Sequence, residues 1–255
     1  MRRLVPVRLL AAWVILASLA TGCAQMPGGT SDTDRLYHAI AVDDAGYLQQ
    51  AVRSGRVSVH QVIRAPGYLE GAPLILIAAK YASLNTLRYL ISAGANLNAR
   101  AATGETALML ASYFSGSDLQ GDGGSNEHHE RAVRMLVEAG ASLENTRNDY
   151  TPLAYAAYRG HLRIVRYLLE RGARVDAGAH DGIAYVNTPL MMAALQGHRD
   201  TAVWLLRAGA DPRTRIHQGH TAYDLAMKNN HHNLLNALRC AERLAPGETF
   251  AMRCQ

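Results

Sequence analysis

The sequence has 255 residues, of which 49% are hydrophobic and 18% are charged, and its formal net charge is +5. A chain of this length and apolar content can bury one or two cores, which excludes an intrinsically disordered protein. Three of the arginines lie in the first eight residues, and removing them lowers the net charge from +5 to +2. The sequence has no basic run and no zinc-finger spacing, so nucleic-acid binding is not expected.

The first 22 residues have the features of an export signal. Three arginines precede an uncharged apolar run at residues 9–20, which is too short to span a bilayer as a stable helix. The following Thr21-Gly22-Cys23 resembles the lipobox of bacterial lipoproteins, although alanine rather than the usual leucine stands three residues before the cysteine. The resemblance implies that residues 1–22 are removed and that Cys23 is lipidated. An ordinary secretory signal, cut nearby, is the alternative.

The segment after the cysteine predicts where the protein resides. Ala24 is not the aspartate that often retains lipoproteins in the inner membrane, so the resemblance implies an outer-membrane anchor facing the periplasm. Residues 23–33 are polar and contain Pro27-Gly28-Gly29, which predicts a flexible tether that reaches about 35 Å. We expect membrane contact through the lipid anchor only and a monomer when no partner is bound.

A unit of two short helices recurs from residue 34 onward. In its clearest copy, Thr151 caps a helix that starts with Pro152, Gly160-His161 interrupt the chain, and an amphipathic second helix stops at Gly172. The equivalent cap positions are 39, 33, 45, 37 and 33 residues apart, so the period is 33 with three insertions, which we expect to lengthen loops and turns. These positions are Asp34, Pro73, Thr106, Thr151, Thr188 and Thr221.

This period, together with Thr-Pro-Leu at 151–153 and 188–190 and with Gly-His at 160–161 and 197–198, is similar to the ankyrin repeat. The resemblance implies an all-α ankyrin-repeat solenoid of about six helix-pair repeats with β-turn fingers and degenerate end caps. We expect it to cover residues 34–239. The histidine that often follows Thr-Pro-Leu in the family is replaced in every copy, which calls the usual polar network into question but not the fold.

The tail at residues 240–255 carries two cysteines. Once Cys23 is assigned to the lipid, Cys240 and Cys254 remain, with thirteen residues between them. In an oxidising compartment we expect a disulfide that pins the tail and contributes on the order of 3 kcal/mol. Two free thiols are the alternative.

The resemblance also implies a concave face that binds another protein. In ankyrin repeats this face holds the turn residues just before each cap and the residues near the end of the first helix. Tyrosine and arginine, which dominate interface hot spots, are frequent at these places. For Tyr113 and Phe114, a core role is the alternative. The predicted partner-binding residues are Lys80, Tyr81, Tyr113, Phe114, Arg147, Tyr150, Tyr158, Arg159, Tyr185, Gln196, His217 and Lys228.

No motif in the sequence predicts catalysis. There is no nucleophile elbow, no HExxH and no phosphate-binding glycine loop, so we predict no catalytic residue, no metal site and no cofactor. The repeat alignment predicts that four histidines bond the backbone of an adjoining turn. They are His129, His161, His198 and His231.

The leading hypothesis is a non-catalytic periplasmic protein that binds and inhibits or stabilises a partner. By analogy with exported bacterial ankyrin proteins, the partner is either a toxin delivered by a secretion system, which an immunity protein neutralises, or a periplasmic antioxidant enzyme. The alternative is a metal-dependent or hydrolytic enzyme that uses the polar loop at residues 115–130, with Glu127, His128 and Glu130 as candidate ligands.

Overall fold

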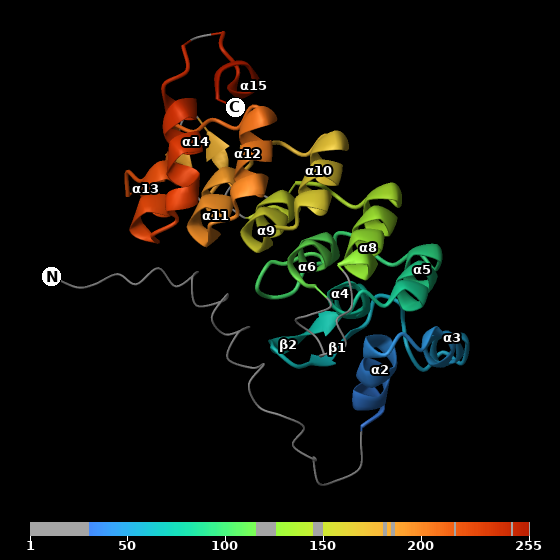
Figure 1. Cartoon of the computed structure of the whole chain (residues 1–255). Helices are drawn as coiled ribbons and strands as arrows, with labels where there is room; N and C mark the ends of the chain where they lie inside the picture. The colour runs from blue at the N-terminus through green and yellow to red at the C-terminus, as the bar shows by residue number, and fades with distance from the viewer. Residues whose placement is uncertain are drawn as a thin grey trace, which may run out of the picture. The chain divides into compact units, whose positions relative to one another are not determined.

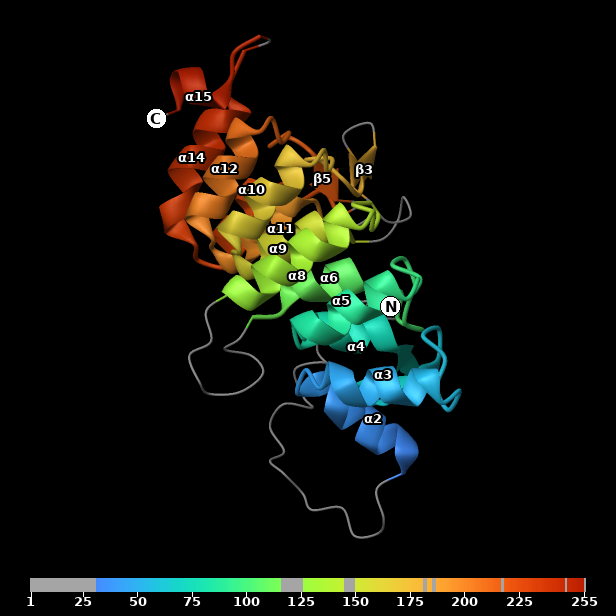
Figure 2. The same cartoon turned by 90° about the vertical axis from the view of Figure 1, so that its right-hand side faces the viewer.

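The computed structural model describes residues 31–115, 126–144, 150–180, 183–184, 187–216, 218–245 and 247–254. The predicted signal peptide, almost all of the tether and Cys23 lie outside these residues. The chain divides into two compact units, Met1–Ala107 and Leu108–Gln255, called unit 1 and unit 2 below. In each unit, helices follow one another in short pairs (Figures 1 and 2).

Unit 1 contains two helix pairs with a hairpin between them. The first helix starts earlier than predicted, because Ser31 and Asp34 form a reciprocal cap in which each side chain accepts a hydrogen bond from the other residue's backbone N–H. Asp34 is therefore in the first turn, and the prediction that it is the cap is wrong. The helices are α2 (Asp32–Ala41), α3 (Ala45–Arg53), α4 (Leu74–Lys80) and α5 (Leu84–Ser92).

The insertion before the second repeat forms a hairpin of two antiparallel strands, β1 (Val62–Ala65) and β2 (Tyr68–Pro73), rather than only a longer turn. In β1, buried Ile63 and Ala65 alternate with exposed Val62 and Arg64, as expected for a strand with one face on the core. Gly71 lets the strands approach, since a Cβ there would lie 2.6 Å from the carbonyl oxygen of Ile63.

Unit 2 stacks further helix pairs in the same order. The first helices of successive pairs pack side by side, α9 on α11 and α11 on α13, and the second helices form a parallel layer through α8, α10, α12 and α14 (Figure 1). The helices are α6 (Ala107–Tyr113), α8 (Glu127–Glu138), α9 (Pro152–Arg159), α10 (Leu162–Glu170), α11 (Pro189–Gln196), α12 (Arg199–Arg207), α13 (Ala222–Lys228), α14 (His232–Glu242) and α15 (Phe250–Arg253).

The core of unit 2 runs between its two helix layers. On α10, Ile164, Val165 and Leu168 are buried along one face, while the buried alanines at 156 and 157 keep α9 thin enough for its neighbours to approach. A buried leucine contributes roughly 1.5–3 kcal/mol, but one helix pair cannot cover such a stripe by itself. Stacking of successive pairs therefore supplies most of the stability.

Helix boundaries in both units follow local signals. The hydroxyls of Thr151 and Thr188 accept hydrogen bonds from the backbone N–H groups of Ala154 and Met191, at 3.2 and 3.3 Å. The predicted helix stops have positive φ angles; they are Gly55, Gly94, Gly140, Gly172 and Gly209. Within the described ranges, no helix has the length and apolar content needed to cross a membrane.

Short strands and a pinned tail complete unit 2. Strand β4 (Ile183–Ala184) pairs antiparallel with β3 (Ala179–His180) and parallel with β5 (Arg215–Ile216). Helix α14 continues to Glu242, beyond the predicted limit at residue 239, because Leu238 and Ala241 extend its buried face. A disulfide joins Cys240 to Cys254, and α15 packs against α12 and α14 with Phe250 buried.

Candidate protein-binding surface

The ends of the first helices in unit 2 carry five of the twelve predicted contact residues. Tyr113 is the last residue of α6, Tyr158 and Arg159 end α9, Gln196 ends α11 and Lys228 ends α13. Gln196 and Lys228 are exposed, whereas Tyr113, Tyr158 and Arg159 are half-buried. The shared position follows from the repeat, because each first helix begins at its cap and runs for a similar length.

Four tyrosine rings form a series of contacts between the end of α6 and the length of α9. The Tyr113 ring stacks on the Tyr158 ring with centroids 6.1 Å apart, and it also packs edge-to-face on Tyr155 at 5.6 Å. Tyr155 in turn packs edge-to-face on Tyr150 at 6.1 Å. We call Tyr113, Tyr150, Tyr155 and Tyr158 the tyrosine cluster. These are the preferred geometries of aromatic pairs, so the rings hold one another in place.

The charged neighbour of this cluster is Arg159, whose guanidinium lies 5.2 Å from the centre of the Tyr113 ring. Burial, and to a lesser extent the neighbouring Tyr158, raise the pKa of Tyr150, although a backbone hydrogen bond with Asn187 lowers it. The Tyr150 hydroxyl is therefore neutral at neutral pH. The tyrosine cluster and the neighbouring Arg159 together present aromatic rings and one positive charge. This combination suits contact with apolar and acidic groups of a partner.

Four other predicted contact residues are either buried or outside the described residues. Phe114 is only 2% exposed and packs edge-to-face on Tyr113, so the prediction that it contacts a partner is wrong and the core alternative holds for it. Its burial follows from its position one residue beyond α6, where the ring turns inward. Arg147, Tyr185 and His217 lie outside the described residues.

Unit 1 contains a second group of predicted contacts, at the end of α4. The ammonium of Lys80 lies 5.6 Å from the Tyr81 ring centre and 5.7 Å from that of Tyr68. Tyr37 of α2 hydrogen-bonds Tyr81 through its hydroxyl. Burial lowers the pKa of Lys80 and raises the pKa values of Tyr37 and Tyr68.

Tyr37, Tyr68 and Tyr155 were not predicted from the sequence. Tyr155 lies three and four residues before Tyr158 and Arg159, so helical spacing could have placed it on their face. Tyr68 lies in the hairpin, which the repeat alignment does not cover. Tyr37 lies on a helix whose start the alignment misplaced. The repeat pattern therefore did not assign either residue to the binding face.

Ankyrin-repeat models match three segments of the chain. A model of three ankyrin repeat copies matches residues 124–179, and a model of the single ankyrin repeat matches residues 72–102 and 187–216. The chain contains ankyrin repeats. Together with the helix pairs and the very short strands, the matches confirm an all-α ankyrin solenoid. Ankyrin repeats are generally non-catalytic modules that bind other proteins, and the chain accordingly has a protein-interaction module.

In three ankyrin repeats a histidine occupies the N-cap position of the second helix, at His161, His198 and His231. Each Nε2 faces a backbone carbonyl of the preceding repeat, and since a carbonyl only accepts, Nε2 must carry the proton. The acceptors are the carbonyl oxygens of Tyr113 at 3.3 Å, Tyr158 at 3.0 Å and Leu195 at 3.0 Å. His161 and His198 thus hold the helix ends that carry Tyr113 and Tyr158.

The ring of His198 also lies directly on the preceding repeat, because a Cβ on Gly160 would be 2.5 Å from its Nδ1. Burial lowers the pKa of His198, and this outweighs the opposing effect of its bond to the Tyr158 carbonyl. His129 is placed differently: α8 begins a turn earlier than its counterparts, so His129 lies buried inside the helix and Asn126 occupies the capping position.

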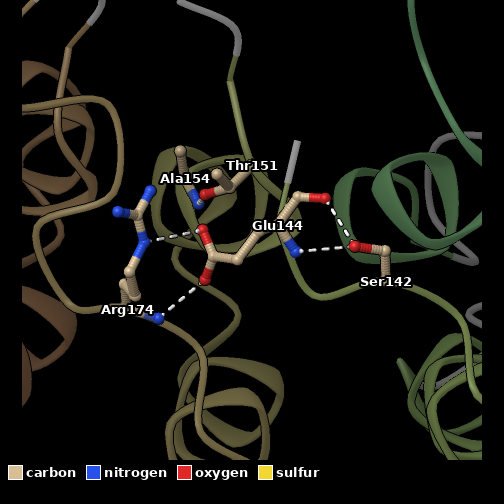
Figure 3. Close-up of polar contacts among 5 residues, drawn as sticks. All are labelled: Ser142, Glu144, Thr151, Ala154 and Arg174. Carbon is tan, nitrogen blue, oxygen red and sulfur yellow. Dashed lines mark hydrogen bonds and ion pairs between the residues drawn. The ribbon is translucent and has the colours of Figure 1, made fainter. Parts of the chain in front are cut away.

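A second link joins the turns of successive ankyrin repeats (Figure 3). The Glu144 carboxylate accepts hydrogen bonds from the Arg174 backbone N–H at 2.8 Å and from its Nε at 3.4 Å. One repeat further on, Asp176 accepts a bond from the Asp211 N–H at 3.1 Å. These carboxylates bridge neighbouring turns.

The described residues contain no group of three His, Cys, Asp or Glu side chains that could hold a metal ion. Glu130, a candidate ligand in the enzyme alternative, forms an ion pair with Arg163 at 3.1 Å. Residues 116–125, which make up most of that loop, lie outside the described ranges.

Proposed function

We propose that this chain is a non-catalytic periplasmic protein that binds a partner protein at the tyrosine cluster and is held at the outer membrane by a lipid on Cys23. The single observation that carries the binding site is the packing of four tyrosines, two of them at the ends of adjacent first helices. The lipobox-like sequence before Cys23 supports the anchor and the compartment.

The geometry of the tyrosine cluster favours binding energetically. The rings already restrict one another's rotamers. Binding a partner would therefore cost little additional side-chain entropy. Tyrosine offers a large contact area with few rotatable bonds, and a hydroxyl for polar contacts. Arg159, on the same helix end, adds a planar cation of the kind that is frequent in hot spots.

Two roles fit this proposal. As an immunity protein, the chain would block a toxin that a secretion system delivers to the periplasm, and an anchored inhibitor would wait where such a toxin arrives. As an accessory factor, it would stabilise a periplasmic antioxidant enzyme. The partner decides between the roles: a hydrolytic toxin supports the first, and a peroxide-consuming enzyme supports the second.

A double variant tests the surface. Tyr113→Ala with Tyr158→Ala removes the stacked pair but keeps the backbone carbonyls to which His161 and His198 bond. We expect an unchanged far-ultraviolet circular dichroism spectrum and loss of the captured partner, with affinity lowered at least about 30-fold if both residues are hot spots. Binding would be measured by calorimetry once a pull-down from periplasmic extract has identified the partner.

The matched control is Trp204→Ala. Trp204 lies on α12, in the layer of second helices, and its ring also packs under an arginine, Arg166, at 4.3 Å. This change removes an aromatic ring and a cation–π contact without touching the tyrosine cluster. A double variant that retained every partner of the unaltered protein would refute the assignment of the surface.

A further inference from the structure

The hairpin of unit 1 exposes apolar side chains. Leu69 is fully exposed, Val62 is 53% exposed, and Val42 at the end of α2 is 59% exposed. Among the described residues, five large hydrophobic side chains are exposed, and these three all lie in unit 1, the shorter of the two units. The ring contacts and ion pairs of the tyrosine cluster do not involve them.

The charge around the two hairpin side chains, Val62 and Leu69, is positive. Between residues 53 and 73, the exposed side chains Arg53, Arg56 and Arg64 oppose the single carboxylate of Glu70. Apolar side chains framed by arginines suit a surface that is apolar inside and anionic outside, which describes a bilayer with acidic headgroups.

The hairpin is also close to the predicted anchor along the chain. From Cys23 to Ser31 the chain spans at most about 28 Å, and the ten residues of α2 add about 15 Å. Strand β1 packs directly against α2 and pairs with β2, which carries Leu69. A lipid on Cys23 would therefore keep the hairpin within reach of the membrane surface.

We propose that the β1–β2 hairpin docks on the lipid bilayer, with Leu69 and Val62 entering the headgroup region and Arg64 facing acidic lipid headgroups. This inference rests on the lipid anchor of the proposed function and extends the expectation of membrane contact through the lipid alone. It gives unit 1 a fixed face toward the membrane.

A weak contact is sufficient for this role. Transferring one leucine out of water favours the bound state by a factor of roughly ten to a hundred, too little to hold a free protein on a membrane. A short tether, however, presents the hairpin to the bilayer at an effective concentration of about millimolar order. The anchor and the hairpin together then form the two signals that stable attachment requires.

The experiment uses the chain from Cys23 onward with its disulfide intact. The protein has three cysteines, so with Cys240 and Cys254 joined, only Cys23 is available for coupling to a maleimide lipid in vesicles of phosphatidylethanolamine and phosphatidylglycerol. Leu69→Trp reports insertion, and Met227→Trp, at an exposed apolar position of unit 2, is the matched control. The native Trp204 contributes the same fluorescence background to both tryptophan variants.

We expect the emission of the Leu69→Trp variant to shift to the blue on coupling and to be quenched by brominated lipid, relative to Met227→Trp. Adding Arg64→Glu should reduce the quenching. In the unaltered chain, hydrogen exchange at residues 62–73 should slow on coupling, which tests docking without a change at Leu69.

Equal quenching of the two tryptophan variants, or hydrogen exchange at residues 62–73 unchanged by coupling, would overturn the proposal. A blue shift that requires an added partner protein would overturn it in favour of a protein contact. The lipid in this experiment is attached chemically, so the result does not depend on lipidation in the cell. If protein isolated from cells carried no fatty acid on Cys23, the proposed anchor would be wrong but hairpin docking would not be. If the double tyrosine variant still captured the partner, only the proposed binding surface would be wrong.

Discussion

At the scale of single residues, polar side chains link neighbouring repeats. In unit 1, the Asp43 carboxylate reaches the start of α5 and accepts bonds from the backbone N–H groups of Asn85 at 3.1 Å and Thr86 at 2.8 Å. Ser83, the capping residue of that helix, makes no such bond with its side chain. Asp43 therefore serves as the cap for a helix in the next repeat.

Replacing Asp43 should destabilise unit 1. Asp43 has φ +62°, so Asp43→Gly removes the carboxylate without adding backbone strain, and we expect a loss of about 1–2 kcal/mol in the free energy of unfolding. Asp43→Asn keeps one acceptor oxygen and should lose less. Urea unfolding measures both, and a glycine variant as stable as the original chain would contradict the cap.

His198 makes stability depend on pH. Burial lowers its pKa below the ordinary value of 6.5, so as the pH falls below that value the unfolded chain takes up a proton before the folded one does. This contribution to stability is complete above pH 6.5 and is lost as the pH decreases, by at most about 1.4 kcal/mol per pH unit.

His198→Gln tests this dependence, because glutamine does not titrate. The stability difference between the original chain and the variant should shrink between about pH 7.5 and 5.5 in urea titrations. Parallel pH profiles for the two proteins would show that His198 does not contribute.

At the scale of elements, the contact between successive repeats depends on a missing side chain. Gly160 ends α9 with φ +70°, and a Cβ there would overlap the His198 ring at 2.5 Å. Gly172 ends α10 with φ +92° and has nothing within 4 Å of the same point. Both glycines have a positive φ angle, but only Gly160 lies against a side chain of the next repeat.

Gly160→Ala and Gly172→Ala form a matched pair. Both should lose about 1–2 kcal/mol through the left-handed backbone conformation, and Gly160→Ala should lose about 1–3 kcal/mol more because the His198 ring must move. Thermal or urea unfolding gives the difference. Equal losses would mean that the ring moves aside without cost.

At the scale of the whole molecule, a repeat protein gains stability from contacts between neighbours, so its ends need special cover. In the described residues, the helix pair α13–α14 is followed by α15 and not by another pair. Its exposed side receives α15, which buries Phe250 and is joined to α14 by the disulfide. The tail therefore acts as an end cap that the disulfide holds.

Cys240→Ser with Cys254→Ser should release this cap. For a closed loop of this size the expected loss is about 3 kcal/mol, and nearest-neighbour packing should confine its effect to the end of the chain. Hydrogen exchange should accelerate in α14 and remain unchanged in α9, with Cys23→Ser as the control. Faster exchange throughout unit 2 would contradict the nearest-neighbour description.

Much of the fold could be predicted from local patterns. The 33-residue period, the Thr-Pro helix starts at 151 and 188 and the glycine stops act within a few residues, so the structure repeats them closely. The starts of α2 and α8 were misplaced because the alignment carried one cap position through all copies. A fixed period does not report how far a particular helix extends beyond that position.

The site could be predicted only in part. The sequence placed Tyr113, Tyr158 and Arg159 at equivalent ends of repeats, but not their contacts with Tyr155 and Tyr150. Whether a ring faces solvent or the core depends on neighbours from other repeats, which a period does not encode. Phe114 shows this directly, since it follows Tyr113 in the chain and is nevertheless buried.

The sequence by itself determined the repeating helix pairs, their caps and stops, and the presence of two cysteines in the tail, because each depends on residues close together in the chain. Only the tertiary structure decided which rings meet, which histidine holds which helix end, and that the insertion before α4 folds into a hairpin with Leu69 exposed. Those outcomes depend on packing between segments distant in sequence, where shape and burial select one arrangement among many that the local pattern allows.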